Sequence, residues 1–268
     1  MKKAGIVCCS NGLPAHKKDE ISKLKQQLRQ LNIIAVESPY LYASHGIRSA
    51  DSKKRAEVIT KMNDDETIDM IFDVSGGDIA NEILDELDFQ LLHKPFWGYS
   101  DLTTVLNAIY AKTARPSVLY QIRHITDNEQ QKKYWQEKTL FDLNYKIVKG
   151  QKVSGIVIGG NIRCFLKLAG TPYFPDVKDK ILLLEANSGD EAKLITYFSQ
   201  LKQMGVFQQI RGVLLGTFSQ YYRQHDLADL LKLLEPFVSN ELTIISTADI
   251  GHGKNAKAIV IGKEYVFS

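Results

Sequence analysis

The chain has few cysteines and no long apolar run. Its three cysteines, Cys8, Cys9 and Cys164, form no C-x-x-C pair, which argues against a disulfide framework and a zinc knot. We expect buried thiols in a reducing cytoplasm. No segment approaches the roughly 18 consecutive apolar residues of a membrane span, and the apolar stretch 4–9 is too short for a secretory signal. The sequence therefore predicts a soluble cytoplasmic protein with no membrane partner.

A strong excess of one charge is also missing. The net charge is +3 and the short Lys/Arg clusters are dispersed, so nucleic acid is not an expected partner. Neither H-x-x-x-H nor HExxH occurs, and GxGxxG and Walker patterns are absent. We therefore expect no metal, no cofactor and no nucleotide phosphate loop. Five histidines have weaker sequence contexts than His252, and none of them forms a metal-binding pattern: His16, His45, His93, His124 and His225.

Strand and helix signals alternate along the first half with short connections. This pattern predicts an α/β domain, with a parallel sheet covered by helices on both faces. A charged helix over 126–138 and a mixed stretch after it predict a linker, so we expect domains over 1–140 and 141–268. The spacing of Ile21, Leu24, Leu28 and Leu31 predicts a helix over 19–31, and a strand is expected over 33–37. The expected segments also include a helix over 79–87, a turn over 159–161, and a closing hairpin of 258–261 and 265–267.

The tetrapeptide Gly98-Tyr99-Ser100-Asp101 stands where a short apolar run gives way to a helical pattern. There a serine hydroxyl would be lifted clear of the backbone, close to the positive end of the helix dipole. This position suits the nucleophile of an acyl-transfer enzyme. A Ser-Asp pair before an apolar helix is also an ordinary N-cap, and the G-x-S-x-G pattern is not met because Leu102 replaces its second glycine.

Three further positions have two interpretations each. Glu185 follows the apolar strand 181–184, where it is either a functional buried carboxylate or the point at which the strand reaches solvent. His252 lies between two glycines that permit a sharp turn, and is either catalytic or incidental. The loop Ser75-Gly76-Gly77-Asp78 is either a tight turn after a strand or a source of N–H groups for an oxyanion.

Taken in order, these segments resemble the LD-carboxypeptidase family of serine peptidases, which includes the microcin-C immunity peptidases. The resemblance covers nearly the whole chain. The matching segments are Asp73-Val74-Ser75-Gly76-Gly77, Gly98-Tyr99-Ser100-Asp101-Leu102-Thr103, Gly159-Gly160-Asn161, Leu168-Ala169-Gly170-Thr171-Pro172-Tyr173, 181–185 and Gly251-His252-Gly253.

The resemblance implies a Ser-Glu-His triad in a cleft between the domains, with a smaller, β-rich second domain. Ser100 would be the nucleophile, His252 the general base and acid, and Glu185 the residue that orients the imidazole. The backbone N–H groups of Gly77 and Asp101 would hold the oxyanion. The resemblance also implies a homodimer, and substrate contacts from Gly76, Asp78 and Asn161.

The sequence departs from the family at the loop, where the family often has Arg-Gly-Gly-Tyr-Gly and this chain has Ser75-Gly76-Gly77-Asp78-Ile79. The leading hypothesis is release of terminal D-alanine from a cytoplasmic murein tetrapeptide, by hydrolysis of an L,D-peptide bond during murein recycling. One alternative is an immunity peptidase that acts on peptidyl- or aminoacyl-nucleotide amides. Another is a non-catalytic two-domain protein that binds a small ligand.

Overall fold

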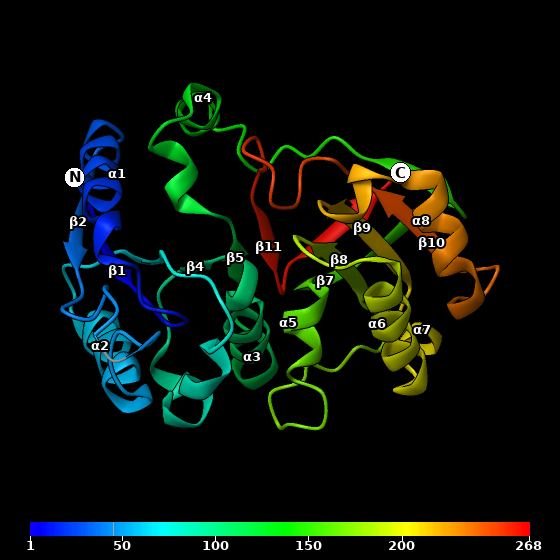
Figure 1. Ribbon diagram of the computed structural model, residues 1–268, viewed down its shortest axis with the longest axis horizontal. Helices are drawn as coiled ribbons and strands as arrows, with labels where there is room; N and C mark the ends of the chain where they lie inside the picture. The colour runs from blue at the N-terminus through cyan, green and yellow to red at the C-terminus, as the bar shows by residue number, and fades with distance from the viewer. Residues whose placement is uncertain (45) are drawn as a thin grey trace.

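The computed structural model describes residues 1–44 and 46–268, so His45 lies outside the described residues. Two six-stranded sheets form the centres of two domains (Figure 1). In the first sheet, five parallel strands are bordered by one antiparallel strand at the β5 edge. The order is β2 (Ile33–Glu37), β1 (Lys2–Val7), β3 (Met70–Asp73), β4 (Phe96–Gly98), β5 (Ser117–Leu119) and β11 (Ile259–Ile261).

Helices cover both faces of the first sheet, because its strands bury side chains on both sides. Ala4 and Ile6 of β1 join the hydrophobic cluster that contains Leu24 and Leu28 of α1, whereas Val7 joins the opposite cluster. The elements of this domain are α1 (Lys18–Gln30), α2 (Ser52–Asp64), the 3₁₀ segment η2 (Ala80–Glu86), α3 (Thr103–Thr113) and α4 (Glu129–Gln136).

The second sheet has four parallel central strands and an antiparallel strand at each edge. The order is β12 (Glu264–Phe267), β7 (Val153–Asn161), β8 (Ile181–Ala186), β9 (Gly212–Phe218), β10 (Thr243–Ser246) and β6 (Lys146–Lys149). Its helices are α5 (Ile162–Leu166), α6 (Glu191–Gln203), α7 (Val206–Gln209) and α8 (Leu227–Leu234). The expected two-domain α/β fold with parallel-rich sheets is confirmed. The domain boundary at residue 140 stays a prediction.

The expected C-terminal hairpin is wrong, because its two strands enter different sheets. β11 pairs with β5 in the first sheet, and β12 pairs with β7 in the second. Gly262, with φ of +85°, turns the chain between them. Each strand covers a free sheet edge, which satisfies more backbone groups than a two-stranded hairpin would.

Two other local predictions differ from the structure, and two strands were not predicted. The segment predicted as a helix over 79–87 is a 3₁₀ helix over Ala80–Glu86, and the predicted turn at 159–161 is the end of β7. Strands β5 and β6 were not predicted, because three or four residues are too few to establish a period. No described helix has the length and apolar character needed to cross a membrane.

The two domains meet where α3 packs against α5 and β7. Asn107 of α3 donates to the carbonyl of Gly159 and accepts from its N–H, each at 2.8 Å. The Thr103 hydroxyl oxygen accepts from the N–H of Asn161 at 3.0 Å. These buried bonds hold the carboxyl end of β7 against the helix that follows Ser100, and so they fix the second domain beside the nucleophile candidate.

Candidate active site

Ser100 begins the short 3₁₀ helix η4 (Ser100–Leu102), directly after β4 and before α3. Its φ is +56°, a left-handed conformation that a non-glycine residue adopts at a cost of about 1–3 kcal/mol. The N-cap position belongs to Tyr99, and no side chain caps this helix. The alternative that Ser100 is an ordinary N-cap is therefore wrong. A strained serine between a strand and a helix is typical of an exposed nucleophile.

The side chains of Ser100, His252 and Glu185 form a continuous hydrogen-bonded chain. His252 Nε2 lies 3.1 Å from Ser100 Oγ, and His252 Nδ1 lies 2.7 Å from Glu185 Oε2. Because a carboxylate only accepts, Nδ1 carries the proton and Nε2 is left as the acceptor of the Ser100 hydroxyl proton. The structure thus brings together three residues that are separated by up to 152 positions in the sequence.

Strand β8 places Glu185 in the second domain. Glu185 is paired in register with Asn161 of β7, whose N–H is bonded to Thr103. Its side chain is fully buried, so the interpretation that the strand reaches solvent at this residue is wrong. A buried carboxylate is costly unless it is paired, and here the imidazole of His252 is the partner.

His252 is presented by the loop after β10. Gly251 has φ of +145°, and a Cβ atom at this position would lie only 1.7 Å from Thr217 Oγ1, so a larger residue would displace the loop. The ring of Tyr99 packs against the imidazole with a centroid separation of 4.6 Å. The glycine and the aromatic ring together restrict the imidazole to the position between Ser100 and Glu185.

The loop after β3 brings Gly77 to the same region. Gly77 has φ of +125°, and a Cβ atom there would lie 2.2 Å from Asn11 Cγ, so glycine is required. Asn11 Oδ1 accepts from the N–H of Asp78 at 3.0 Å, which holds the loop. Within residues 1–44 and 46–268, the N–H of Gly77 donates to no acceptor, and so it is available to a ligand.

The three residues that were predicted to contact the substrate all make contacts within the protein. Asp78 forms ion pairs with Arg163 and Lys167, the latter at 3.7 Å. Asn161 Oδ1 caps α5 by accepting from the N–H of Cys164 at 3.3 Å. Gly76 pairs with Asn11 in an isolated antiparallel bridge. These three residues border the site, and their roles toward a substrate stay predictions.

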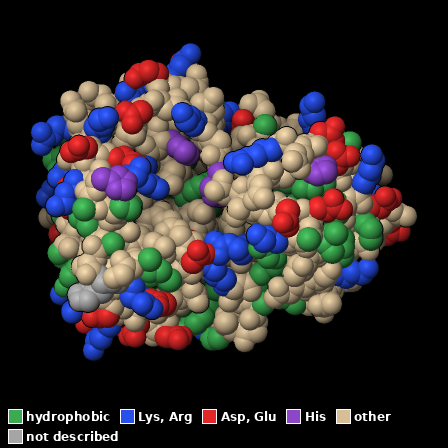
Figure 2. Space-filling model, viewed as in Figure 1, with side chains coloured by type: hydrophobic (Ala, Val, Ile, Leu, Met, Phe, Trp, Pro, Cys, Tyr) green, Lys and Arg blue, Asp and Glu red, His purple; other side chains and the backbone are tan. Residues whose placement is uncertain are grey.

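A cavity of about 340 Å³ is lined by residues from three separate parts of the chain. Figure 2 shows histidine and cationic side chains around a hollow near the middle of the face that is turned toward the viewer. Lys17 and Arg123 both pair with Glu20, and in the described part of the chain no ion pair involves the ammonium group of Lys254. The other lining residues are Gln121, His124, Thr126, Asp127 and Asn128.

Lys254 of the cavity lining belongs to the same loop as His252. Lys254 is two residues beyond His252. Burial, together with the charges of Arg123 and His252, lowers the pKa of His124 to about 4. Arg123 and Lys254 were not among the predicted residues, although a lysine so close to the Gly-His-Gly turn was an available signal.

The three cysteines are excluded as competing nucleophiles. All are buried free thiols, as expected. Burial is the main cause that raises the pKa of Cys8 to about 12 and raises those of Cys9 and Cys164 well above the usual range. They are therefore protonated and unreactive near neutral pH. Among the described residues, no group of His, Cys, Asp and Glu side chains is arranged to hold a metal ion.

Comparison with known proteins gives a consistent assignment for both halves of the chain. Residues 4–120 match the model of the LD-carboxypeptidase N-terminal domain. Residues 154–266 match the model of the LD-carboxypeptidase C-terminal domain. Together the two ranges leave only the segment between the domains and the chain ends unmatched.

The similar proteins include both carboxypeptidases and a microcin self-immunity protein. A probable murein peptide carboxypeptidase of Bacillus subtilis is 26% identical over 81% of this chain and 74% of its own. The microcin C7 self-immunity protein MccF of Escherichia coli is 27% identical over 68% of this chain and 63% of its own. The structure of muramoyltetrapeptide carboxypeptidase from Oxalobacter formigenes superimposes with a TM-score of 0.84 at 20% identity, covering 99% of this chain and 94% of that one.

Proposed function

We propose that this chain, which belongs to the LD-carboxypeptidase family of serine peptidases, releases terminal D-alanine from a murein tetrapeptide in the cytoplasm. The observation that carries the catalytic assignment is the chain of hydrogen bonds from Ser100 through His252 to Glu185. Each residue comes from a different strand end or loop. Such a convergence around one hydroxyl is the arrangement that acyl transfer by serine requires.

The chemistry follows from the positions of the donors and acceptors. His252 Nε2 takes the proton of Ser100 as Oγ attacks the substrate carbonyl carbon, and the carboxylate of Glu185 stabilises the imidazolium that forms. The backbone N–H groups of Gly77 and Asp101 donate to the oxyanion. His252 then protonates the leaving amine, and the acyl-enzyme is hydrolysed by a water molecule that His252 activates.

The ammonium group of Lys254 in the cavity, unpaired among the residues that the structure describes, supports a peptide with a free carboxylate as the substrate. A carboxypeptidase must recognise the terminal carboxylate of its substrate, and Lys254 has no ion-pair partner within the described residues. Arg123 adds a planar donor that suits a carboxylate, although it is shared with Glu20 at 3.2 Å. We assign the carboxylate end of the substrate to this cavity.

The alternative substrate is an aminoacyl- or peptidyl-nucleotide amide, by analogy with the MccF relative. One feature favours the nucleotide amide: the loop Ser75-Gly76-Gly77-Asp78-Ile79 departs from the common family pattern. Recognition of a nucleobase usually uses an aromatic platform. The described lining of the cavity contains no Phe, Tyr or Trp. This absence favours the peptide.

The test is hydrolysis of the free murein tetrapeptide, with D-alanine release as the measurement. We expect turnover by the wild-type protein, and a loss of about 10⁴- to 10⁶-fold in kcat for Ser100→Ala. A parallel measurement of kcat/KM on an aminoacyl-nucleotide amide separates the two substrate classes. Faster hydrolysis of the nucleotide amide would overturn the peptide assignment, and equal D-alanine release by Ser100→Ala would overturn the assignment of Ser100 as the nucleophile.

The homodimer implied by the family resemblance stays a prediction, which sedimentation velocity would test.

A further inference from the structure

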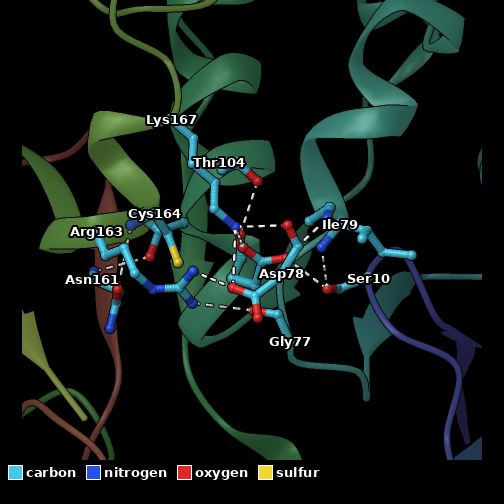
Figure 3. A network of polar contacts seen from close by, with 12 residues as sticks. Ser10, Gly77, Asp78, Ile79, Thr104, Asn161, Arg163, Cys164 and Lys167 are labelled. Atoms are coloured by element: carbon cyan, nitrogen blue, oxygen red, sulfur yellow. Dashed lines mark hydrogen bonds and ion pairs between the residues drawn. The ribbon is translucent and has the colours of Figure 1, made fainter. Parts of the chain in front are cut away.

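Two cations of the second domain contact the loop and the turn on which the proposed oxyanion donors lie. Arg163 lies within α5 and Lys167 is its C-cap residue, four positions later, so both side chains lie on the same face. Figure 3 shows them pointing toward Gly77 and Asp78 of the first domain. We name this pair the α5 clamp.

Lys167 joins the two proposed donor segments directly. Its ammonium lies 2.5 Å from Asp101 Oδ1 and 2.8 Å from the carbonyl oxygen of Asp78. The Asp101 carboxylate is fully buried, and its other oxygen accepts from the Ser10 hydroxyl at 2.6 Å and the N–H of Ala80 at 2.8 Å. One lysine therefore neutralises a buried carboxylate in the turn beside Ser100 and holds the backbone of the opposite loop.

Arg163 holds the same loop from a second direction. Its guanidinium donates to the carboxylate of Asp78 and, at 3.3 Å, to the carbonyl of Gly77. Among residues 1–44 and 46–268 no acceptor takes the N–H of Gly77, and its positive φ makes its peptide orientation dependent on such external contacts. The loop is thus fixed by Asn11 on its own domain and by the α5 clamp across the cleft.

From these contacts we infer that Lys167 and Arg163 are positioning residues, which align the N–H groups of Gly77 and Asp101 for the transition state. The inference rests on the proposed function, because it assumes that Ser100 is the nucleophile. Oxyanion donors act through fixed orientation, and loss of one donor typically costs about 10²- to 10³-fold in rate. A clamp formed by the second domain makes this alignment depend on correct docking of the two domains.

The test uses a fluorophosphonate probe, which does not require the natural substrate. Ser100 Oγ forms a bond to phosphorus, fluoride leaves, and His252 accepts the hydroxyl proton, while negative charge develops on the phosphoryl oxygen. We expect Lys167→Met to lower the maximal labelling rate by about 10- to 100-fold, with little change in the concentration for half-maximal rate. The pH at which labelling is half-activated should not change, because the His252–Glu185 pair is untouched. Lys178→Met, an exposed lysine of the same domain, is the matched control.

A second variant separates positioning from loss of charge balance. Lys167→Met leaves Asp101 buried without its cation, so thermal unfolding is measured alongside labelling. The double variant Asp101→Asn/Lys167→Met removes both charges and is expected to fold but to label slowly, since the bond to the Asp78 carbonyl is still missing. Arg163→Met should give a smaller reduction in the labelling rate.

Wild-type labelling by a folded Lys167→Met protein would overturn the clamp, as would recovery of the wild-type rate by the double variant. Absence of labelling in the wild-type protein would instead contradict the proposed nucleophile. The two failures are therefore distinguishable.

Discussion

The side-chain amide of Asn107 exchanges two hydrogen bonds with the backbone of Gly159, each 2.8 Å long. This contact joins the helix after the nucleophile to the end of β7, next to the strand that carries Glu185. The relative placement of Ser100 and Glu185 therefore depends on how α3 packs against β7. A substitution of Asn107 tests this dependence.

We predict that Asn107→Leu lowers the free energy of unfolding by about 1–3 kcal/mol, because the N–H and carbonyl of Gly159 become buried and unpaired. Peptidase activity should fall as well, since the distance between the domains changes at the triad. Denaturant unfolding and D-alanine release measure the two effects. Asn240→Ala, at an exposed residue, is the control and should change stability by less than about 0.5 kcal/mol. An unchanged Asn107→Leu protein would show that this contact does not hold the interface.

Glu185→Gln should lower kcat by about 10³- to 10⁴-fold while the fold is retained, because an amide at this position favours the wrong imidazole tautomer. The bond from His252 Nδ1 to Glu185 Oε2 is the contact that changes. Steady-state kinetics on the tetrapeptide, with circular dichroism as the check of folding, makes the measurement. A kcat within a few-fold of wild type would exclude Glu185 from the triad.

Lys254→Met should raise KM for the tetrapeptide by about 10-fold with a smaller change in kcat, because a charge-assisted hydrogen bond to the substrate carboxylate is lost. The wild-type enzyme should discriminate against a tetrapeptide whose C-terminal carboxylate is amidated, and the variant should discriminate less. Lys263→Met is the control, at an exposed lysine outside the cavity lining. Equal discrimination by variant and wild type would place the carboxylate elsewhere.

His124 should make the protein less stable as the pH falls. Its folded pKa, lowered to about 4 by burial and by Arg123 and His252, is below the usual value of 6.5, so the unfolded chain binds the proton more readily. Stability from this residue is constant above about pH 6.5 and is lost as the pH falls toward 4. We expect the fall in Tm between pH 7 and 4.5 to be smaller in His124→Gln than in wild type. His16→Gln, at an exposed histidine, should show the wild-type fall. An identical dependence of Tm on pH in His124→Gln and wild type would contradict the lowered pKa of His124.

Most of the fold was predictable because its elements are long and periodic. The apolar spacing of Ile21, Leu24 and Leu28 indicated a helix, and these residues are buried on one face of α1. Strand β2 occupies the predicted residues. The elements that were missed are short or depend on distant partners: β5 has three residues, and β11 and β12 look like a hairpin until their separate sheet edges are known.

The residue pattern was enough to predict an α/β fold and to mark Ser100, Glu185 and His252 as positions with a functional and a structural interpretation. The peptidase triad itself was implied by the family resemblance, not by any local pattern. Docking of the two domains determined the rest. It gave Ser100 a histidine at 3.1 Å and set Lys167 against Asp101. These contacts join residues that are far apart in the chain, so their energies depend on packing between domains, which no local pattern encodes.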